Sequence, residues 1–173
     1  MIDTKTGRLS IGIYGGTFDP LHEGHLAIMD DSINIVDLLM VVPNKKSPFK
    51  INKKNKLTDE HRLNMIGEYI KYKHNMYLDD TEIKKDGISY TIDTVKRFAK
   101  DKRKIFLILG MDAFNDFEKF KDYKKIASKV NFILYTRPGY VINKALHEKY
   151  KNKIIIRELN YNISSTELRK QHD

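Results

Sequence analysis

The stretch that most constrains this chain is the run GGTFDPLHEGH at residues 15–25. An apolar, strand-like run precedes it at residues 11–14, and apolar residues with helical spacing follow it at Leu26, Met29 and Ile33. A strand, a glycine turn and a helix start, in this order, form the usual frame for a phosphate-binding turn in an α/β fold. The run therefore predicts an α/β protein that binds a phosphate group at this turn.

The residue types within this run suit an anion. Gly15 and Gly16 allow the backbone to turn tightly and to approach a ligand closely, and Thr17 offers a hydroxyl and an N–H. His22 and His25 are three residues apart, so both can point to one side of a helix N-terminus. That end of a helix attracts anions, and imidazoles placed there can donate hydrogen bonds to phosphate oxygens. The alternative is a plain tight turn with two surface histidines.

Apolar runs and helical patterns alternate along the rest of the chain. The apolar runs at 36–42, 76–78, 104–109, 131–135 and 154–156 indicate strands. Helical patterns begin near 58 and 89 and cover 112–117, 123–128 and 145–150. This alternation predicts a mostly parallel, doubly wound sheet with helices on both faces and right-handed crossovers. Ligands of such sheets bind beyond the carboxyl ends of the strands, and Lys50, Asp112 and Arg137 each follow a predicted strand.

Composition limits the class of protein. The 173 residues fit one domain, with 1–10 as a polar N-terminal extension. The absence of cysteine excludes disulfides and thiolate metal sites and suits a cytoplasmic protein. No apolar run approaches the roughly 18 residues of a membrane span, so we expect no membrane partner. The net charge of +9 suits nucleic acid, nucleotides or a solvated lysine-rich surface alike. A homo-oligomer is compatible with the sequence, which does not reveal oligomeric state.

A second motif, ISSTELR at 163–169, lies near the C-terminus. Ser164 and Glu167 fit a capping box, which needs no ligand. Alternatively, the hydroxyls and N–H groups of this helix start, with Arg169 nearby, bind phosphates. Together with the first motif, it provides two positive helix ends that can hold a triphosphate from both sides.

The two motifs together resemble the signature of the nucleotidyltransferase superfamily with the H-x-G-H motif. Four stretches between them, PFK at 48–50, SYTIDT at 89–94, GMD at 110–112 and RPGY at 137–140, narrow the resemblance to bacterial nicotinate-nucleotide adenylyltransferases. The resemblance covers residues 11–169 and implies one Rossmann-like nucleotidyltransferase domain over 1–173. It also implies an enzyme of NAD biosynthesis that transfers the adenylyl group of ATP to nicotinate mononucleotide, giving deamido-NAD and pyrophosphate.

The resemblance also implies how ATP is bound. His22 and His25 would be the catalytic residues, donating to the α-phosphate. The ATP site would comprise Gly15, Gly16, Thr17, Phe18, His22, His25, Ser164, Ser165, Thr166 and Arg169. Mg²⁺ would arrive with ATP, bound mainly by phosphates and water as this ion prefers. We therefore expect no dedicated metal site in the protein.

For the mononucleotide, the resemblance implies a site made of Lys50, Tyr90, Thr91, Asp112, Phe120 and Arg137. Tyr90 and Thr91 would lie at the nicotinate carboxylate, and Lys50 near the phosphate. Asp112 could equally cap its helix, and Arg137 could equally form a structural salt bridge. Phe120 occupies the place where the family usually stacks a Trp on the pyridine ring.

The chain departs from the family pattern in three respects. Within the Pro-Pro-His-Lys stretch, Phe49 stands where the family usually has His and Ser47 stands where it has the first proline. The whole chain has no Trp. Relatives also continue past the last motif, whereas this sequence stops at Asp173, as expected of a minimal form without the C-terminal helical extension, a shortened form, or part of a longer polypeptide.

Alternative functions remain within and outside the superfamily. Adenylyltransferases of nicotinamide mononucleotide or phosphopantetheine, and cytidylyltransferases, are the nearest alternatives. The phosphopantetheine enzymes usually carry Thr where His22 stands, and cytidylyltransferases favour a different C-terminal motif. A basic nucleic-acid-binding module is the alternative of another class. Because the chain lacks aromatic-interleaved strand motifs and helix-turn-helix or zinc signatures, we expect no nucleic-acid partner.

Overall fold

The computed structural model describes residues 9–99, 103–136 and 139–159. In these ranges, six strands form one sheet in the order β3-β2-β1-β4-β5-β6. Every neighbouring pair is parallel. The strands are β1 (Ser10–Gly16), β2 (Leu38–Pro43), β3 (Met76–Leu78), β4 (Lys104–Gly110), β5 (Val130–Thr136) and β6 (Ile154–Glu158). The predicted Rossmann-like, doubly wound architecture is confirmed, and the described sheet is parallel throughout.

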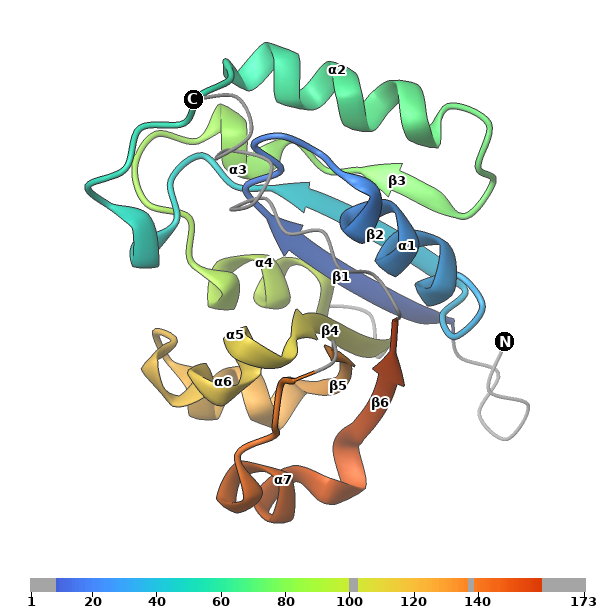
Figure 1. Cartoon of the computed structure of the whole chain (residues 1–173), viewed down its shortest axis with the longest axis vertical. Coiled ribbons are helices and arrows are strands. Elements are labelled where there is room, and N and C mark those ends of the chain that lie inside the picture. The colour runs from blue at the N-terminus through green and yellow to red at the C-terminus, as the bar shows by residue number, and fades with distance from the viewer. Residues whose placement is uncertain (1–8, 100–102, 137–138, 160–173) are drawn as a thin grey trace.

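Helices cover both faces of this sheet, as Figure 1 shows. On one face lie α1 (Glu23–Ser32) and α2 (Asp59–Ile70), which pack through the fully buried Met29 and Ile66. On the other face lie α4 (Thr91–Phe98), α5 (Met111–Asn115), α6 (Tyr123–Lys129) and α7 (Lys144–Tyr150). The short elements are η1 (Pro48–Lys50), α3 (Thr81–Lys84), η3 (Phe117–Lys119) and η4 (Lys151–Lys153).

The central strands contribute to both hydrophobic cores because successive side chains point to opposite faces. On β4, Ile105 and Leu107 pack beneath α4 to α7. Phe106 and Ile108, which alternate with them, pack beneath α1 and α2. A strand buried on both faces must be apolar at every position, which explains the continuous apolar run that predicted it.

Some element boundaries differ from the predicted ones. β2 begins at Leu38 rather than at 36, and it ends with Pro43, which pairs in register with Gly16. A proline is tolerated at this last strand position because few ladder hydrogen bonds remain to be made. Helix α3 was not predicted, since four residues are too few to show a helical period. The helix predicted from residue 163 lies outside the described residues.

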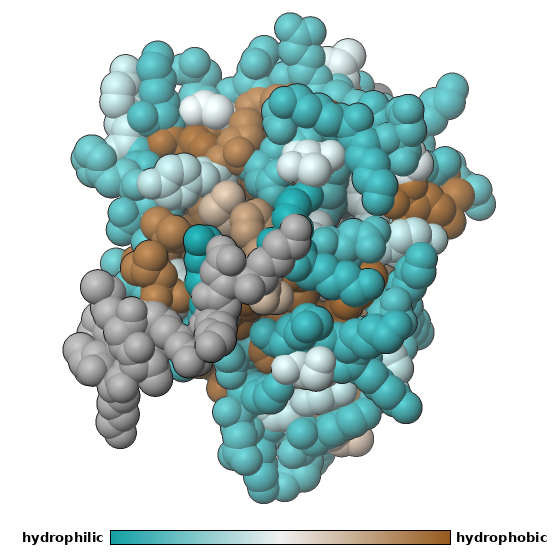
Figure 2. Space-filling model, turned by 180° about the vertical axis from the view of Figure 1, so that it is seen from behind, coloured by the Kyte–Doolittle hydropathy of each residue, from teal (hydrophilic) through white to brown (hydrophobic). Residues whose placement is uncertain are grey.

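On the face that Figure 2 shows, most of the surface is hydrophilic, and the hydrophobic residues lie mainly about its middle. Across the described ranges, no helix is long and apolar enough to cross a membrane.

Candidate active site

A cavity of about 570 Å³ lies at the carboxyl ends of the central strands. Gly16 of β1, Gly110 of β4 and Thr136 of β5 line it, together with Asn44, which directly follows β2. From β1 the strands continue through β2 to β3 on one side of the sheet, and from β4 they continue through β5 to β6 on the other. The cavity therefore lies where the strand order reverses, between β1 and β4. Both its position and its volume suit a nucleotide-sized ligand.

The predicted histidine pair lines this cavity at the N-terminus of α1. His22 is the N-cap residue, and its carbonyl accepts from the backbone N–H groups of His25 and Leu26, at 2.8 and 3.1 Å. The two imidazole rings are stacked, with their centroids 3.7 Å apart. The helix start therefore presents two ring systems and the positive end of its dipole to the same space.

One hydrogen bond assigns the tautomer of His25. The backbone N–H of His22 donates to Nδ1 of His25 at 3.3 Å. Because Nδ1 accepts, the ring proton of neutral His25 is on Nε2, which can donate to an oxygen of a ligand.

Phe18 is buried and packs against the ring of His25. Its side chain is 1% exposed and is not among the residues that line the cavity. Its ring lies 5.0 Å from the ring of His25 and 5.5 Å from that of Tyr14, measured between centroids. Phe18 has a left-handed backbone (φ +50°), which few residues other than glycine adopt. The structure thus places the predicted ATP-binding Phe18 side chain behind the histidine, away from the cavity.

The turn itself faces the cavity through Gly15, Gly16 and Thr17. A Cβ atom built on Gly16 would approach the ring of Phe18 to 2.8 Å, so this position has no room for a larger residue. Glycine at this position therefore serves a close approach between the turn and the buried ring.

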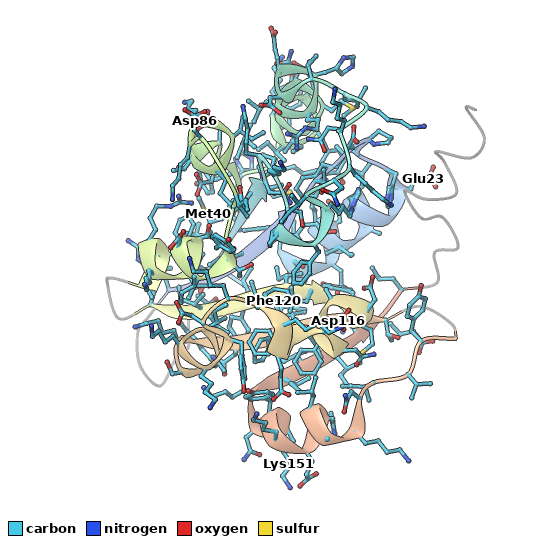
Figure 3. All side chains as sticks on the ribbon, turned by 90° about the vertical axis from the view of Figure 1, so that its left-hand side faces the viewer. Glu23, Met40, Asp86, Asp116, Phe120 and Lys151 are labelled. Carbon is cyan, nitrogen blue, oxygen red and sulfur yellow. The ribbon has the colours of Figure 1, made fainter. Side chains whose placement is uncertain are left out.

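The opposite wall carries four of the residues predicted for the mononucleotide. Lys50, Thr91, Asp112 and Phe120 all line the cavity. Thr91 is the first residue of α4, and Asp112 lies in the first turn of α5. Figure 3 shows Phe120 near the middle of that side of the molecule.

Phe49 joins this wall from a different element. It is 54% exposed, lies in η1, and lines the cavity. Its ring centroid is 5.2 Å from that of Phe120. The two rings, at the positions where the sequence departs from the family pattern, thus form one aromatic surface.

Not every predicted residue lies in the cavity. Tyr90 is the N-cap residue of α4 and lines a smaller neighbouring cavity, with Lys121 Nζ 4.2 Å from its ring centroid. Arg137, Ser164, Ser165, Thr166 and Arg169 lie outside the described residues.

Several lining residues were missed by the sequence analysis. Glu82 of α3 lines the cavity, and burial raises its pKa even though hydrogen bonds from Thr94 and Ser89 oppose this shift. Tyr135 of β5 also lines it, and its hydroxyl donates to Asp31 at 2.8 Å. Charged residues such as Glu82 usually indicate surface positions, so the sequence carried no signal for its burial.

Asp31, which accepts the hydrogen bond from Tyr135, also forms an ion pair with Arg157. The guanidinium of Arg157 donates to both carboxylate oxygens of Asp31, at 2.8 and 2.5 Å. Hydrogen bonding from Arg157 lowers the pKa of Asp31 below its usual value, with a smaller contribution from Tyr135 and against the effect of burial. This ion pair joins the edge strand β6 to helix α1.

In the ranges that the structure describes, no group of three or more His, Asp or Glu side chains could hold a metal ion. For the chain as a whole, the expected lack of a protein metal site stays a prediction.

Comparison with known protein families finds one family that matches nearly the whole chain. Residues 13–171 match the model of a family described as cytidylyltransferase-like. The chain belongs to this family. A Clostridium acetobutylicum member, named a probable nicotinate-nucleotide adenylyltransferase, is 36% identical over 170 residues, which cover 92% of this chain and 84% of that protein. A Clostridium tetani protein of the same name is 33% identical over 171 residues, with the same coverage of both chains.

Within the cytidylyltransferase-like family, these identities place the chain among the nicotinate-nucleotide adenylyltransferases, as the motifs predicted. The fold agrees with a solved structure of Plasmodium falciparum nicotinic acid mononucleotide adenylyltransferase complexed with NaAD. That structure has a TM-score of 0.79 and 24% sequence identity, and the match covers 94% of this chain and 83% of that one. The sequence identities with the two Clostridium proteins confirm the predicted enzyme class, a nucleotidyltransferase.

Proposed function

We propose that this protein transfers the adenylyl group of ATP to nicotinate mononucleotide, forming deamido-NAD and pyrophosphate in NAD biosynthesis. The observation that carries the proposal is the stacked pair His22 and His25, placed at the start of α1 beside the Gly15–Gly16 turn and facing the cavity. The names of the relatives from Clostridium acetobutylicum and Clostridium tetani support the same reaction.

The transfer requires positioning and charge stabilisation more than covalent help from the protein. An oxygen of the mononucleotide phosphate attacks the α-phosphorus of ATP, and a new P–O bond forms. The bond from the α-phosphorus to the oxygen that bridges it to the β-phosphate breaks, and pyrophosphate leaves with the bonding electrons. Nε2–H of His25 donates to an α-phosphate oxygen as negative charge develops there, with His22 and the start of α1 adding to the positive field.

The remainder of the ATP site follows the second motif. Ser165, Thr166 and Arg169 are proposed to hold the β- and γ-phosphates, which leave together as pyrophosphate, and Ser164 is proposed to belong to the same ATP site. Mg²⁺ is proposed to enter with ATP as part of the substrate, coordinated by phosphate oxygens and water. Neutralising the phosphate charges is the chemistry that this ion supplies.

The mononucleotide is proposed to bind along the wall formed by α4, α5 and Phe120. Thr91, at the first position of α4, offers its hydroxyl and N–H to the nicotinate carboxylate, and the start of that helix favours the negative charge. Phe120 and Phe49 offer ring faces to the pyridine ring. Lys50 is proposed to attract the phosphate, and Asp112 to contact the ligand at the mouth of the cleft.

Three further expectations belong to this proposal. We expect no nucleic acid to bind at physiological salt, because we attribute the net positive charge of the protein to the binding of nucleotides. Assembly into a homo-oligomer stays an open alternative. The cytoplasm is the expected location, because the sequence has no cysteine and ATP is an intracellular nucleotide.

The proposal is tested by pyrophosphate release with ATP and Mg²⁺, using nicotinate mononucleotide, its amide and phosphopantetheine as alternative acceptors. We expect the acid to give the highest kcat/KM. If the amide or phosphopantetheine is preferred, the substrate assignment is wrong. Tight, salt-sensitive RNA binding without ATP turnover would instead favour the nucleic-acid-binding alternative.

The role of the histidine pair is tested with His25→Ala. We expect kcat to fall by about 10²-fold or more, the usual loss when a donor to a developing anion is removed. His74→Ala, which changes an exposed histidine between α2 and β3, is the matched control and should retain wild-type activity. Near-normal turnover of His25→Ala would remove His25 from the mechanism.

A further inference from the structure

Arg62 is a fully buried charged side chain behind the cavity, on helix α2. Its exposed fraction is 0%. Its Nη1 donates to the carbonyl oxygens of Thr17 at 2.6 Å and Asn44 at 3.0 Å, and its Nη2 donates to Asp59 Oδ1 at 2.6 Å. In the part of the chain that the structure describes, the buried Nε has no hydrogen-bond partner. A buried, incompletely bonded guanidinium is a poor means of gaining stability, so its contacts point to another role.

The two carbonyl groups lie where β1 and β2 end. Gly16 and Pro43 are the last register partners of these strands, and the N–H of Asn44 donates to the carbonyl of Gly16 at 2.9 Å. One residue further, the strands present two carbonyl oxygens, which cannot bond to each other. Arg62 joins them by donating to both. It thereby extends the connection between the two strands into the turn that carries Thr17.

Asp59 connects Arg62 to Lys45, in the direction of the other wall of the cavity. Its Oδ2 accepts from Lys45 Nζ at 2.6 Å. The backbone N–H of Lys45 donates to Ser89 Oγ at 3.1 Å, and the N–H of Ser89 donates to the carbonyl of Lys46 at 3.0 Å. Ser89 stands two residues before Thr91. Hydrogen bonds and backbone thus join the phosphate turn to the start of α4, with Arg62 and Asp59 at the centre.

We propose that Arg62 is a positioning residue for adenylyl transfer, which holds the turn at Thr17 in a fixed place relative to the wall at Thr91. This inference rests on the proposed function, in which ATP and the mononucleotide bind on those two sides. Transfer requires the attacking phosphate and the α-phosphate to be held in reacting geometry, and small displacements reduce the rate steeply. Arginine suits the role because its planar fork donates in several fixed directions, whereas the single ammonium of lysine cannot.

The test compares Arg62→Lys with Ile66→Ala. Ile66 is 0% exposed, lies one turn further along α2 and does not line the cavity, so its truncation weakens the same helix without touching the proposed contacts. For Arg62→Lys we expect kcat to fall at least tenfold, with KM for ATP changing less than about threefold, since a 1 Å misplacement costs roughly 10²-fold in rate. Ile66→Ala should have a lower Tm but near wild-type kcat well below it.

Two further measurements complete the test. Asp59→Asn keeps the bonds from Arg62 to both carbonyl groups, so it should lower kcat less than Arg62→Lys does. Hydrogen exchange of amides 15–18 and 44–46, without substrate, should be faster in Arg62→Lys than in the wild type or Ile66→Ala. Unchanged exchange, or equal losses of kcat in Arg62→Lys and Ile66→Ala, would overturn the inference. A wild-type protein that fails to use nicotinate mononucleotide refutes the proposed function instead, and the exchange measurement still decides the role of Arg62.

Discussion

Gly16→Ala should slow this enzyme through the buried ring of Phe18, which does not line the cavity. The added Cβ would lie 2.8, 3.0 and 3.1 Å from three carbons of the Phe18 ring, whereas ordinary contacts begin near 3.4 Å. The ring or the turn must therefore move by about 0.6 Å. Phe18 is 1% exposed and packs against the rings of Tyr14 and His25. The ring cannot retreat into open space, so the displacement passes to His25 or to the turn.

The size of the effect follows from this geometry. Overpacking a well-filled core costs about 1–3 kcal/mol, so the urea midpoint of Gly16→Ala should fall accordingly. A shift of this size at the histidine or the turn should lower kcat roughly tenfold or more, since a misplacement of about 1 Å costs on the order of 10²-fold. Pyrophosphate release and urea unfolding measure the two quantities separately.

A second parent variant, which lacks the aromatic ring of residue 18, tests whether the effect comes from the contact between residue 16 and that ring. In a Phe18→Leu variant the ring is gone, so adding Gly16→Ala should lower kcat and stability much less than it does in the wild type. Gly67→Ala, at an open position on α2 with no atom within 4 Å, is the control and should stabilise the protein by about 0.5–1 kcal/mol. Equal losses from Gly16→Ala in both backgrounds, or activity within twofold of the wild type, would refute the reasoning.

Two further predictions concern the walls of the cavity. Phe120→Ala should raise KM for nicotinate mononucleotide more than KM for ATP, because its ring faces the proposed pyridine site beside Phe49; a selective rise in KM for ATP would contradict this. Asp31→Asn should destabilise the protein near pH 7, because the pKa of Asp31 is lowered in the folded state chiefly by its hydrogen bond from Arg157. Urea unfolding should show a constant difference in the free energy of unfolding between variant and wild type above the unfolded pKa of Asp31. This difference should shrink as pH falls through the lowered pKa of the folded state, and a difference that grows on acidification would contradict the assignment.

The centre of the sheet was predictable because its central strands are buried on both faces. The run around Leu107 must be apolar at every position, and such a run is visible in the sequence itself. The histidine pair was predictable because a helix start fixes the relative positions of residues three apart. The short helix α3 was not, because Thr81–Lys84 is barely one turn.

Buried charge was the least predictable part of the site. Arg62 stands four residues before Ile66, in line with the buried face of α2, and that spacing is the one signal that could have found it. Lys and Arg on a helix usually lie on its solvated side. The contacts that bury Arg62 come from Thr17 and Asn44, 45 and 18 residues away, so they exist only in the folded chain.

The glycine and histidine run combines two kinds of residue that its sequence does not distinguish. Gly15, Thr17 and His22 line the cavity, whereas Phe18 and Asp19 are 1% and 3% exposed. Asp19 accepts hydrogen bonds from the backbone N–H groups of residues 56 and 57 at 2.9 and 2.8 Å, which ties the segment just before α2 to the turn. Membership of the motif therefore identifies residues that build the site, and only burial separates those that face the cavity from those that hold the turn in place.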